Sequence, residues 1–252
     1  MKADNPLLEY LLRLGDNCLI LGHRLSEWVS HSPAIEEELA VANVALDLIG
    51  QGRLWLTLAG QVEGKGRDED KLAYLRDAGE FRNLLLAEQP NGDFAQTMAR
   101  QFYFDAWHYL LLRELTQCKD ARVAEVAAKA SKEVAYHLRR SSDWVMILGD
   151  GTNESHKRMQ AAIDDLWTYT GEMFEMDDVD HALLSQGIAF DLARLREPWL
   201  HHVSGILTEA TLELPQPGWA QRGGRRGVHS EHLGFLLAEM QFLQRAYPNA
   251  TW

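Results

Sequence analysis

The chain has 252 residues, of which 46% are hydrophobic and 25% charged, enough for one large domain with its own core. Its formal net charge of −12 would repel phosphate backbones, so nucleic acid is not expected as a partner. Two cysteines and no long apolar run argue against a disulfide framework, a zinc site or a membrane span, and we expect a cytoplasmic protein.

Apolar residues recur with helical spacing along the first 150 residues, and no alternating run predicts a strand. Ser32 followed by Pro33 is typical of a helix start, and Asp93 followed by Gln96 resembles a capping box. Gly149 to Gly151 is typical of a helix end. The pattern predicts five helices, over residues 6–31, 33–60, 68–89, 94–118 and 121–148.

The second part of the chain continues this pattern with fewer clear boundaries. A helix over 152–174 is followed by an acidic joint, and residues 182–213 look helical with a kink or break at Pro198. The segment 215–228 is the clearest loop, and Ser230 is expected to cap a last helix over 231–245.

These helices predict a single all-α domain over residues 1–252. Short joints connect the second to the fifth helix, which suits a ferritin-like four-helix bundle over about 33–149. The helices over 6–31 and 152–247 would flank this bundle.

Acidic residues near the middle of these four helices suggest a di-metal centre. In di-metal carboxylate proteins each bundle helix places a carboxylate inward, and two helices add a histidine as Glu-x-x-His. The candidates here are Asp47, the stretch 77–82, Asp105 and Glu133. Asp105 follows Asp47 by 58 residues and Glu133 follows Asp105 by 28, a spacing compatible with antiparallel neighbours.

The histidine positions do not match a complete centre. Arg82 falls on the apolar face of its predicted helix, where a ligand would be expected. His137 follows Glu133 by four residues rather than three, and Tyr136 takes the expected position. Asp105 and His108 have the right spacing but no matching second pair. These residues therefore suggest a degenerate metal site.

Three interpretations of this cluster remain open from the residues. Arg82 could neutralise Asp47, Asp105 and Glu133 without metal, because an unpaired buried carboxylate costs several kcal/mol. The acids could instead lie at the edges of the bundle in water. A complete metal centre using His108 and His137 is the third.

Other polar groups have weaker claims to a function. Adjacent histidines cannot chelate from one helix face, so His201–His202 and the pair His229 and His232 are expected at the surface or an interface. Arg222, Arg225 and Arg226 form a basic loop that could hold a phosphate, including that of coenzyme A, or lie at an interface with another protein. The eight tryptophans are expected as core or interface anchors rather than a substrate box.

Four stretches of the sequence are distinctive: 10–24 (YLLRLGDNCLILGHR), 36–53 (EEELAVANVALDLIGQGR), 102–108 (FYFDAWH) and 227–245 (GVHSEHLGFLLAEMQFLQR). They resemble the C subunits of the bacterial phenylacetyl-CoA 1,2-epoxidases (ring 1,2-phenylacetyl-CoA monooxygenases). The similarity extends over about residues 5–252.

The resemblance implies a non-catalytic, structural subunit of a multicomponent monooxygenase in aerobic phenylacetate catabolism. In that family a catalytic A subunit holds the di-iron site and binds phenylacetyl-CoA, and the C subunit pairs with it. A small B subunit and a reductase with FAD and an iron–sulfur centre complete a system that uses NADPH and dioxygen. The resemblance implies no cofactor in this chain.

Two alternatives belong to other functional classes. The chain could be a ferritin-like di-iron or di-manganese oxygenase in its own right, using Asp47, Asp105, His108, Glu133 and His137. It could also be a helical interaction module unrelated to oxygenation.

Overall fold

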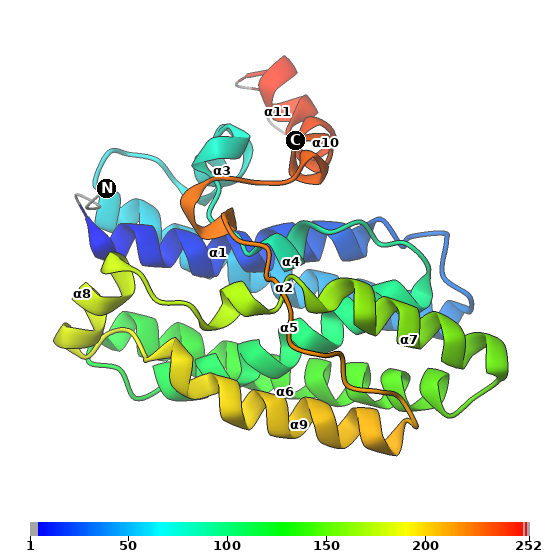
Figure 1. Ribbon diagram of the computed structural model, residues 1–252. Helices are drawn as coiled ribbons and strands as arrows, with labels where there is room; N and C mark the ends of the chain where they lie inside the picture. The colour runs from blue at the N-terminus through cyan, green and yellow to red at the C-terminus, as the bar shows by residue number, and fades with distance from the viewer. Residues whose placement is uncertain (1–4, 249, 251–252) are drawn as a thin grey trace. The chain divides into compact units, whose positions relative to one another are not determined.

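The computed structural model describes residues 5–248 and 250, and across these residues the chain is helical with no strand. The predicted all-α class is therefore confirmed. The chain forms two compact units (Figure 1). The first is built from the described parts of Met1–Pro90 and Arg222–Trp252, and the second from Asn91–Gln221. The expectation of a single domain over 1–252 stays a prediction.

The first unit is built on two long helices that pack along each other, α1 (Pro6–Ser26) and α2 (Ile35–Glu63). Asn5 caps α1 through a hydrogen bond from the Leu8 amide, and Pro6 occupies its first turn. Every residue from 10 to 22 is buried, so α1 contributes to the core of its unit. A Cβ at Gly52 would lie 3.2 Å from the Leu19 nitrogen, which shows how closely the two backbones approach.

The segment 68–89 is not the long helix that the sequence predicts. It contains two short α-helices, α3 (Glu69–Tyr74) and α4 (Leu85–Glu88), and a 3₁₀ turn, η1 (Ala78–Glu80). The backbone between them is extended at Asp77 and Phe81. Leu75 is 52% exposed, so the apolar face inferred from a continuous helix does not exist.

The second unit contains the long helices α5 (Phe94–Leu115) and α6 (Ala121–Gly149), which pack side by side (Figure 1). Two further helices, α7 (Asn153–Trp167) and α9 (Arg196–Glu209), pack on this pair. Asp93, Asp120 and Thr152 cap α5, α6 and α7 by accepting hydrogen bonds from first-turn amides.

Two predicted boundaries in this unit are wrong. The helix expected over 182–213 is instead α8 (Asp178–Gln186), the 3₁₀ turn η3 (Leu192–Leu195) and α9. The break comes at Gly187, which ends α8 with a left-handed φ of 76°. Pro198 lies in the first turn of α9, where a missing amide costs little, so it causes no kink. The helix over 152–174 likewise ends at Trp167 and is followed by the 3₁₀ turn η2 (Gly171–Phe174).

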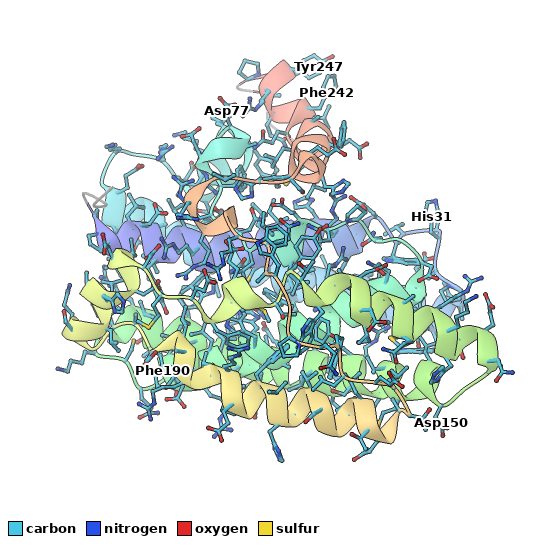
Figure 2. The ribbon with its side chains drawn as sticks, in the orientation of Figure 1. His31, Asp77, Asp150, Phe190, Phe242 and Tyr247 are labelled. Carbon is cyan, nitrogen blue, oxygen red and sulfur yellow. The ribbon has the colours of Figure 1, made fainter. Side chains whose placement is uncertain are left out.

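The end of the chain returns to the first unit. The predicted loop 215–228 is irregular apart from the 3₁₀ turn η4 (Gly224–Arg226), and α10 (Glu231–Met240) and α11 (Phe242–Ala246) follow. Figure 2 labels Phe242 and Tyr247 at this end, where they are 61% and 59% exposed. None of the described helices combines the length and the apolar character needed to cross a bilayer.

Candidate functional site

The six residues of the predicted degenerate centre divide between the two units. Asp47 and Arg82 belong to the first, and Asp105, His108, Glu133 and His137 to the second. The residues of each unit are therefore described separately.

Asp105 is the most deeply placed of these acids, with no exposed surface. Both of its carboxylate oxygens accept hydrogen bonds. Gln101, one turn earlier on α5, donates at 2.7 Å, and Ser141 on α6 donates at 2.9 Å. Burial raises the pKa of Asp105 to about 6, although the charge of His137 and these two hydrogen bonds act in the opposite direction.

His108 and His137 are the imidazoles of the same buried region, 2% and 1% exposed. Burial, followed by the charge of His137, lowers the pKa of His108 to about 3, so this ring is neutral at physiological pH. The His108 ring lies 5.0 Å from that of Phe104, between ring centres. Tyr136, which takes the position of a ligand histidine, is 43% exposed.

Glu133 and Asp47 are less buried than Asp105. Both are partly exposed, and Glu133 lies at the edge of the α6 core face with His137 inside it. Among the described residues, no group of three or more histidine, cysteine, aspartate or glutamate side chains is arranged to hold a metal ion. A di-iron centre needs several carboxylates and imidazoles around each pair of ions, and the degenerate form of such a centre stays a prediction for these residues.

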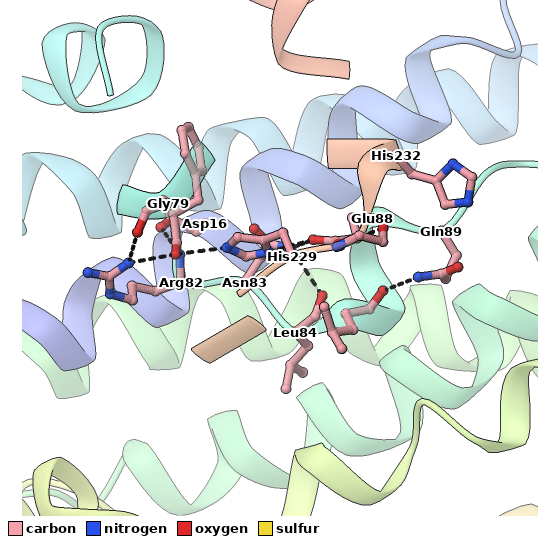
Figure 3. Close-up of polar contacts among 12 residues, drawn as sticks. Asp16, Gly79, Arg82, Asn83, Leu84, Glu88, Gln89, His229 and His232 are labelled. Carbon is pink, nitrogen blue, oxygen red and sulfur yellow. Dashed lines mark hydrogen bonds and ion pairs between the residues drawn. The ribbon is translucent and has the colours of Figure 1, made fainter. Parts of the chain in front are cut away.

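Arg82 has a partner that its position in the sequence does not suggest. Its Nε donates to Glu9 on α1 at 2.6 Å. Its Nη1 donates to the carbonyls of Gly79 and Phe81, both at 2.8 Å, and Figure 3 shows the contact with Gly79. The Arg82 guanidinium thus neutralises Glu9 and fixes the extended chain beside α1. Its expected role among the cluster acids stays a prediction.

A buried ion pair holds the same segment. Arg76, 2% exposed, binds Asp16 on α1, 0% exposed, through both terminal nitrogens. The second oxygen of Asp16 also accepts from the Arg82 amide at 2.8 Å, and Asn17 accepts from the Leu84 amide at 2.7 Å. These bonds satisfy the extended backbone that interrupts the predicted helix.

A second buried group joins α4 to the segment before α10 (Figure 3). Glu88 accepts hydrogen bonds from Asn83 at 2.8 Å, from His229 at 2.7 Å and from both the amide and hydroxyl of Ser230. The other ring nitrogen of His229 lies 3.0 Å from the Phe81 carbonyl. Since both neighbours of the ring are acceptors, the arrangement favours a doubly protonated, charged imidazolium.

His229 was expected at the surface or at an interface. Its side chain is only 3% exposed and contacts Glu88 of its own unit, so the surface part of that prediction is wrong and the interface part stays a prediction. His201 is exposed as expected, and His202 is half-buried with its Nε2 3.3 Å from the Ser142 hydroxyl. Sequence reasoning missed Asp16, Arg76 and Glu88. The one available signal was Asp16, an acidic residue in the middle of a helix rich in leucine.

The basic loop is packed against its own unit. Arg225 is 9% exposed, whereas Arg222 and Arg226 are exposed. A Cβ at Gly224 would lie 2.2 Å from the Asn83 carbonyl oxygen, and one at Gly227 2.2 Å from that of Gly79. The loop is thus fitted closely to residues 79–85, and its role toward a phosphate or another protein stays a prediction.

Comparison with known proteins identifies the family of the chain. The family model described as "Phenylacetic acid catabolic protein" matches residues 1–252. The chain is 50% identical over 248 residues to the C-type subunit of the 1,2-phenylacetyl-CoA epoxidase of Escherichia coli (strain K12), covering 98% of this chain and 100% of that protein. The ferritin-like form of the all-α class is consistent with this family. The chain belongs to the phenylacetic acid catabolic protein family.

Proposed function

We propose that this chain is the C-type, non-catalytic subunit of a phenylacetyl-CoA epoxidase that acts in aerobic phenylacetate breakdown in the cytoplasm. The observation that carries the proposal is the 50% identity to a C-type epoxidase subunit over nearly the whole of both chains. In this proposal the catalytic A subunit holds the di-iron centre and binds phenylacetyl-CoA. A small B subunit and a reductase with FAD, an iron–sulfur centre and NADPH supply the rest.

The surroundings of Asp105 support a non-catalytic role. Gln101 and Ser141 donate hydrogen bonds to the two carboxylate oxygens from within the same unit, so this buried acid has polar partners without a metal ion. The nearby imidazole of His108 has its pKa lowered to about 3 by burial and the charge of His137. A neutral ring is a competent ligand, but among the described residues the carboxylates that should accompany it are not gathered around it.

The proposed contribution of this chain is mechanical. Ligand geometry at a metal site must be held within about 0.5 Å, and rigid supporting helices are the usual means. A second helical subunit packed on the A subunit would fix the helices that bear the iron ligands. The buried pairs Asp16 with Arg76 and Glu88 with His229 tie segments of the first unit together, which supports such a role.

The test is reconstitution with the A subunit, the B subunit and the reductase. With NADPH, dioxygen and phenylacetyl-CoA, epoxide formation is expected only when this chain is present, and it should co-purify with the A subunit. We expect a full di-iron centre in each A subunit and no iron in the isolated chain. A fully active and stable A subunit without this chain would contradict the support role. Stoichiometric iron and oxygen-dependent turnover by the isolated chain would establish the alternative, an oxygenase in its own right.

A further inference from the structure

A cavity of about 170 Å³ lies in the second unit, at the end of α7, and neither the family nor the predicted centre explains it. Its walls come from α7, η2, the first turn of α9 and the loop 214–220. Three tryptophans and a phenylalanine line it: Trp167, Trp199, Trp219 and Phe174. The space is slightly larger than the apolar cavity of about 150 Å³ that holds one benzene molecule in an engineered protein.

The inner wall is pre-formed. Trp199 is 2% exposed, and its indole nitrogen donates to the Tyr103 carbonyl at 3.0 Å, which fixes the ring. The ring of Trp167 lies 5.7 Å from that of Trp199, and the ring of Phe174 lies 5.2 Å from it in an edge-on arrangement. Aromatic partners prefer these offset and edge-to-face geometries, so a flat ring could pack here without rearrangement.

The outer wall is a short loop anchored at one point. The Thr168 hydroxyl donates to the Trp219 carbonyl at 3.1 Å, and the Gln221 amide donates to the Thr168 carbonyl at 2.8 Å. Pro215 and Pro217 restrict the backbone before this anchor. Trp219 nevertheless leaves 75% of its surface exposed, the largest exposed fraction among the large apolar side chains described. An exposed tryptophan beside an aromatic cavity is typical of a ligand site.

The charge of one residue beside the cavity indicates which class of ligand it would bind. Arg196, exposed at the first turn of α9, is the one charged side chain that lines the cavity. Within the part of the chain that the structure describes, its guanidinium takes part in no ion pair or hydrogen bond. A cation with unused donors at the rim of an apolar cavity favours a ligand with an apolar ring and an anionic end.

We propose that this cavity binds a small monocyclic aromatic carboxylate, with its ring between Trp167, Trp199 and Phe174 and its carboxylate on Arg196. The site is independent of the proposed support role, since it lies within this chain and needs no partner residue. The expectation that the tryptophans serve only as anchors would then be incomplete for Trp167, Trp199 and Trp219.

The test titrates the full-length chain with phenylacetate and follows tryptophan fluorescence and calorimetric heat. We expect one site per chain with a dissociation constant of about 1 mM or lower. Phenylacetamide, which has the ring but no charge, should bind about tenfold more weakly. In the variant Arg196→Gln, phenylacetate should also bind about tenfold more weakly, because its carboxylate has lost its cation. The affinity for phenylacetamide should be unchanged in this variant. Leu200→Trp, which fills the cavity, should abolish binding of both.

The control is Arg194→Gln, which removes an exposed arginine two residues away that does not line the cavity and should leave binding unchanged. Far-ultraviolet circular dichroism and the melting temperature would show that each variant is folded. Absence of saturable phenylacetate binding at about 10 mM, on the order of ten times the expected constant, would overturn the proposal. So would binding that Leu200→Trp leaves intact, or equal affinity for the acid and the amide.

Discussion

His229 offers a pH test of a single buried contact. Burial lowers the pKa of this imidazole, but the hydrogen bond and charge of Glu88 and the Phe81 carbonyl raise it more, so the net pKa is above 6.5. A raised histidine pKa means that the folded state holds the proton more tightly than the unfolded chain. Its stabilisation is complete below pH 6.5 and is lost as the pH rises through the folded-state pKa.

The variant His229→Gln should therefore lower the free energy of unfolding at about pH 6 by about 2 kcal/mol, because it leaves the Glu88 charge without its cation. It should also flatten the decline in stability above pH 6.5. Urea unfolding over a series of buffers from mildly acidic to mildly basic measures both. His201→Gln, at an exposed position, is the matched control and should change neither. An unchanged pH slope in His229→Gln would show that the ring is not charged in the fold.

At the scale of elements, the segment 68–89 depends on a buried ion pair rather than on helical propensity. Arg76 and Asp16 are both fully enclosed, and Arg76 also donates to the Glu80 carbonyl at 3.0 Å and stacks 4.3 Å above the Phe81 ring centre. Removing one member leaves the other charge buried and unpaired, which costs about 3–5 kcal/mol. The two variants Asp16→Asn and Arg76→Met should therefore each be strongly destabilising.

A double-mutant cycle separates the pair from its surroundings. Asp16→Asn with Arg76→Met should be less destabilised than the sum of the single variants by about 2 kcal/mol or more, measured by urea unfolding. The exposed pair Glu154 and Arg158, 2.7 Å apart on α7, is the control, and its coupling should stay below about 1 kcal/mol. Additive effects at Asp16 and Arg76 would mean that the pair does not hold the segment.

The segment 68–89 also shows which part of the fold could not be predicted from the sequence. Apolar spacing placed α2, α5 and α6 within a few residues of their observed bounds, because those helices are long and locally specified. The cap expected at Asp93 is present, but the N-cap of α2 is Ala34 rather than Ser32. Leu72 and Leu86 gave a helical spacing across 68–89 as well, but contacts with Asp16 and Asn17 hold that backbone extended. Partners more than 60 residues apart leave no local signal.

For the candidate site, the sequence spacing of the residues predicted contacts between two neighbouring helices but not contacts between segments far apart in the chain. Asp105 and His137 were expected on facing helices, and the structure places them together with Ser141 between α5 and α6. The link from Glu88 to His229 spans 141 residues and was missed, so His229 was assigned to the surface or an interface. A short pair of histidines in a polar context carries no sign of burial.

At the scale of the whole molecule, the support role makes Asp105 a structural residue of the complex. Its folded-state pKa of about 6 lies above the ordinary value of 3.8 because of burial, so the folded chain holds this proton more tightly. Stability is then lost as the pH rises from about 4 to about 6, the cost of charging a buried acid. Asparagine keeps an acceptor oxygen for Gln101, and its amide group can donate to the Ser141 hydroxyl, which accepts as well as donates, so the charge is removed while the contacts can be kept.

In the reconstituted epoxidase, Asp105→Asn is therefore expected to keep iron content and turnover within about twofold of the parent complex, and to lose less stability between about pH 4 and pH 6. Asp105→Ala is the contrasting variant. It deprives both donors of their acceptor and should destabilise the isolated chain by about 2–4 kcal/mol in urea unfolding. If Asp105 were a metal ligand instead, asparagine would lower iron content and turnover together while leaving the fold intact. Iron analysis and initial rates on the same preparation separate the two roles.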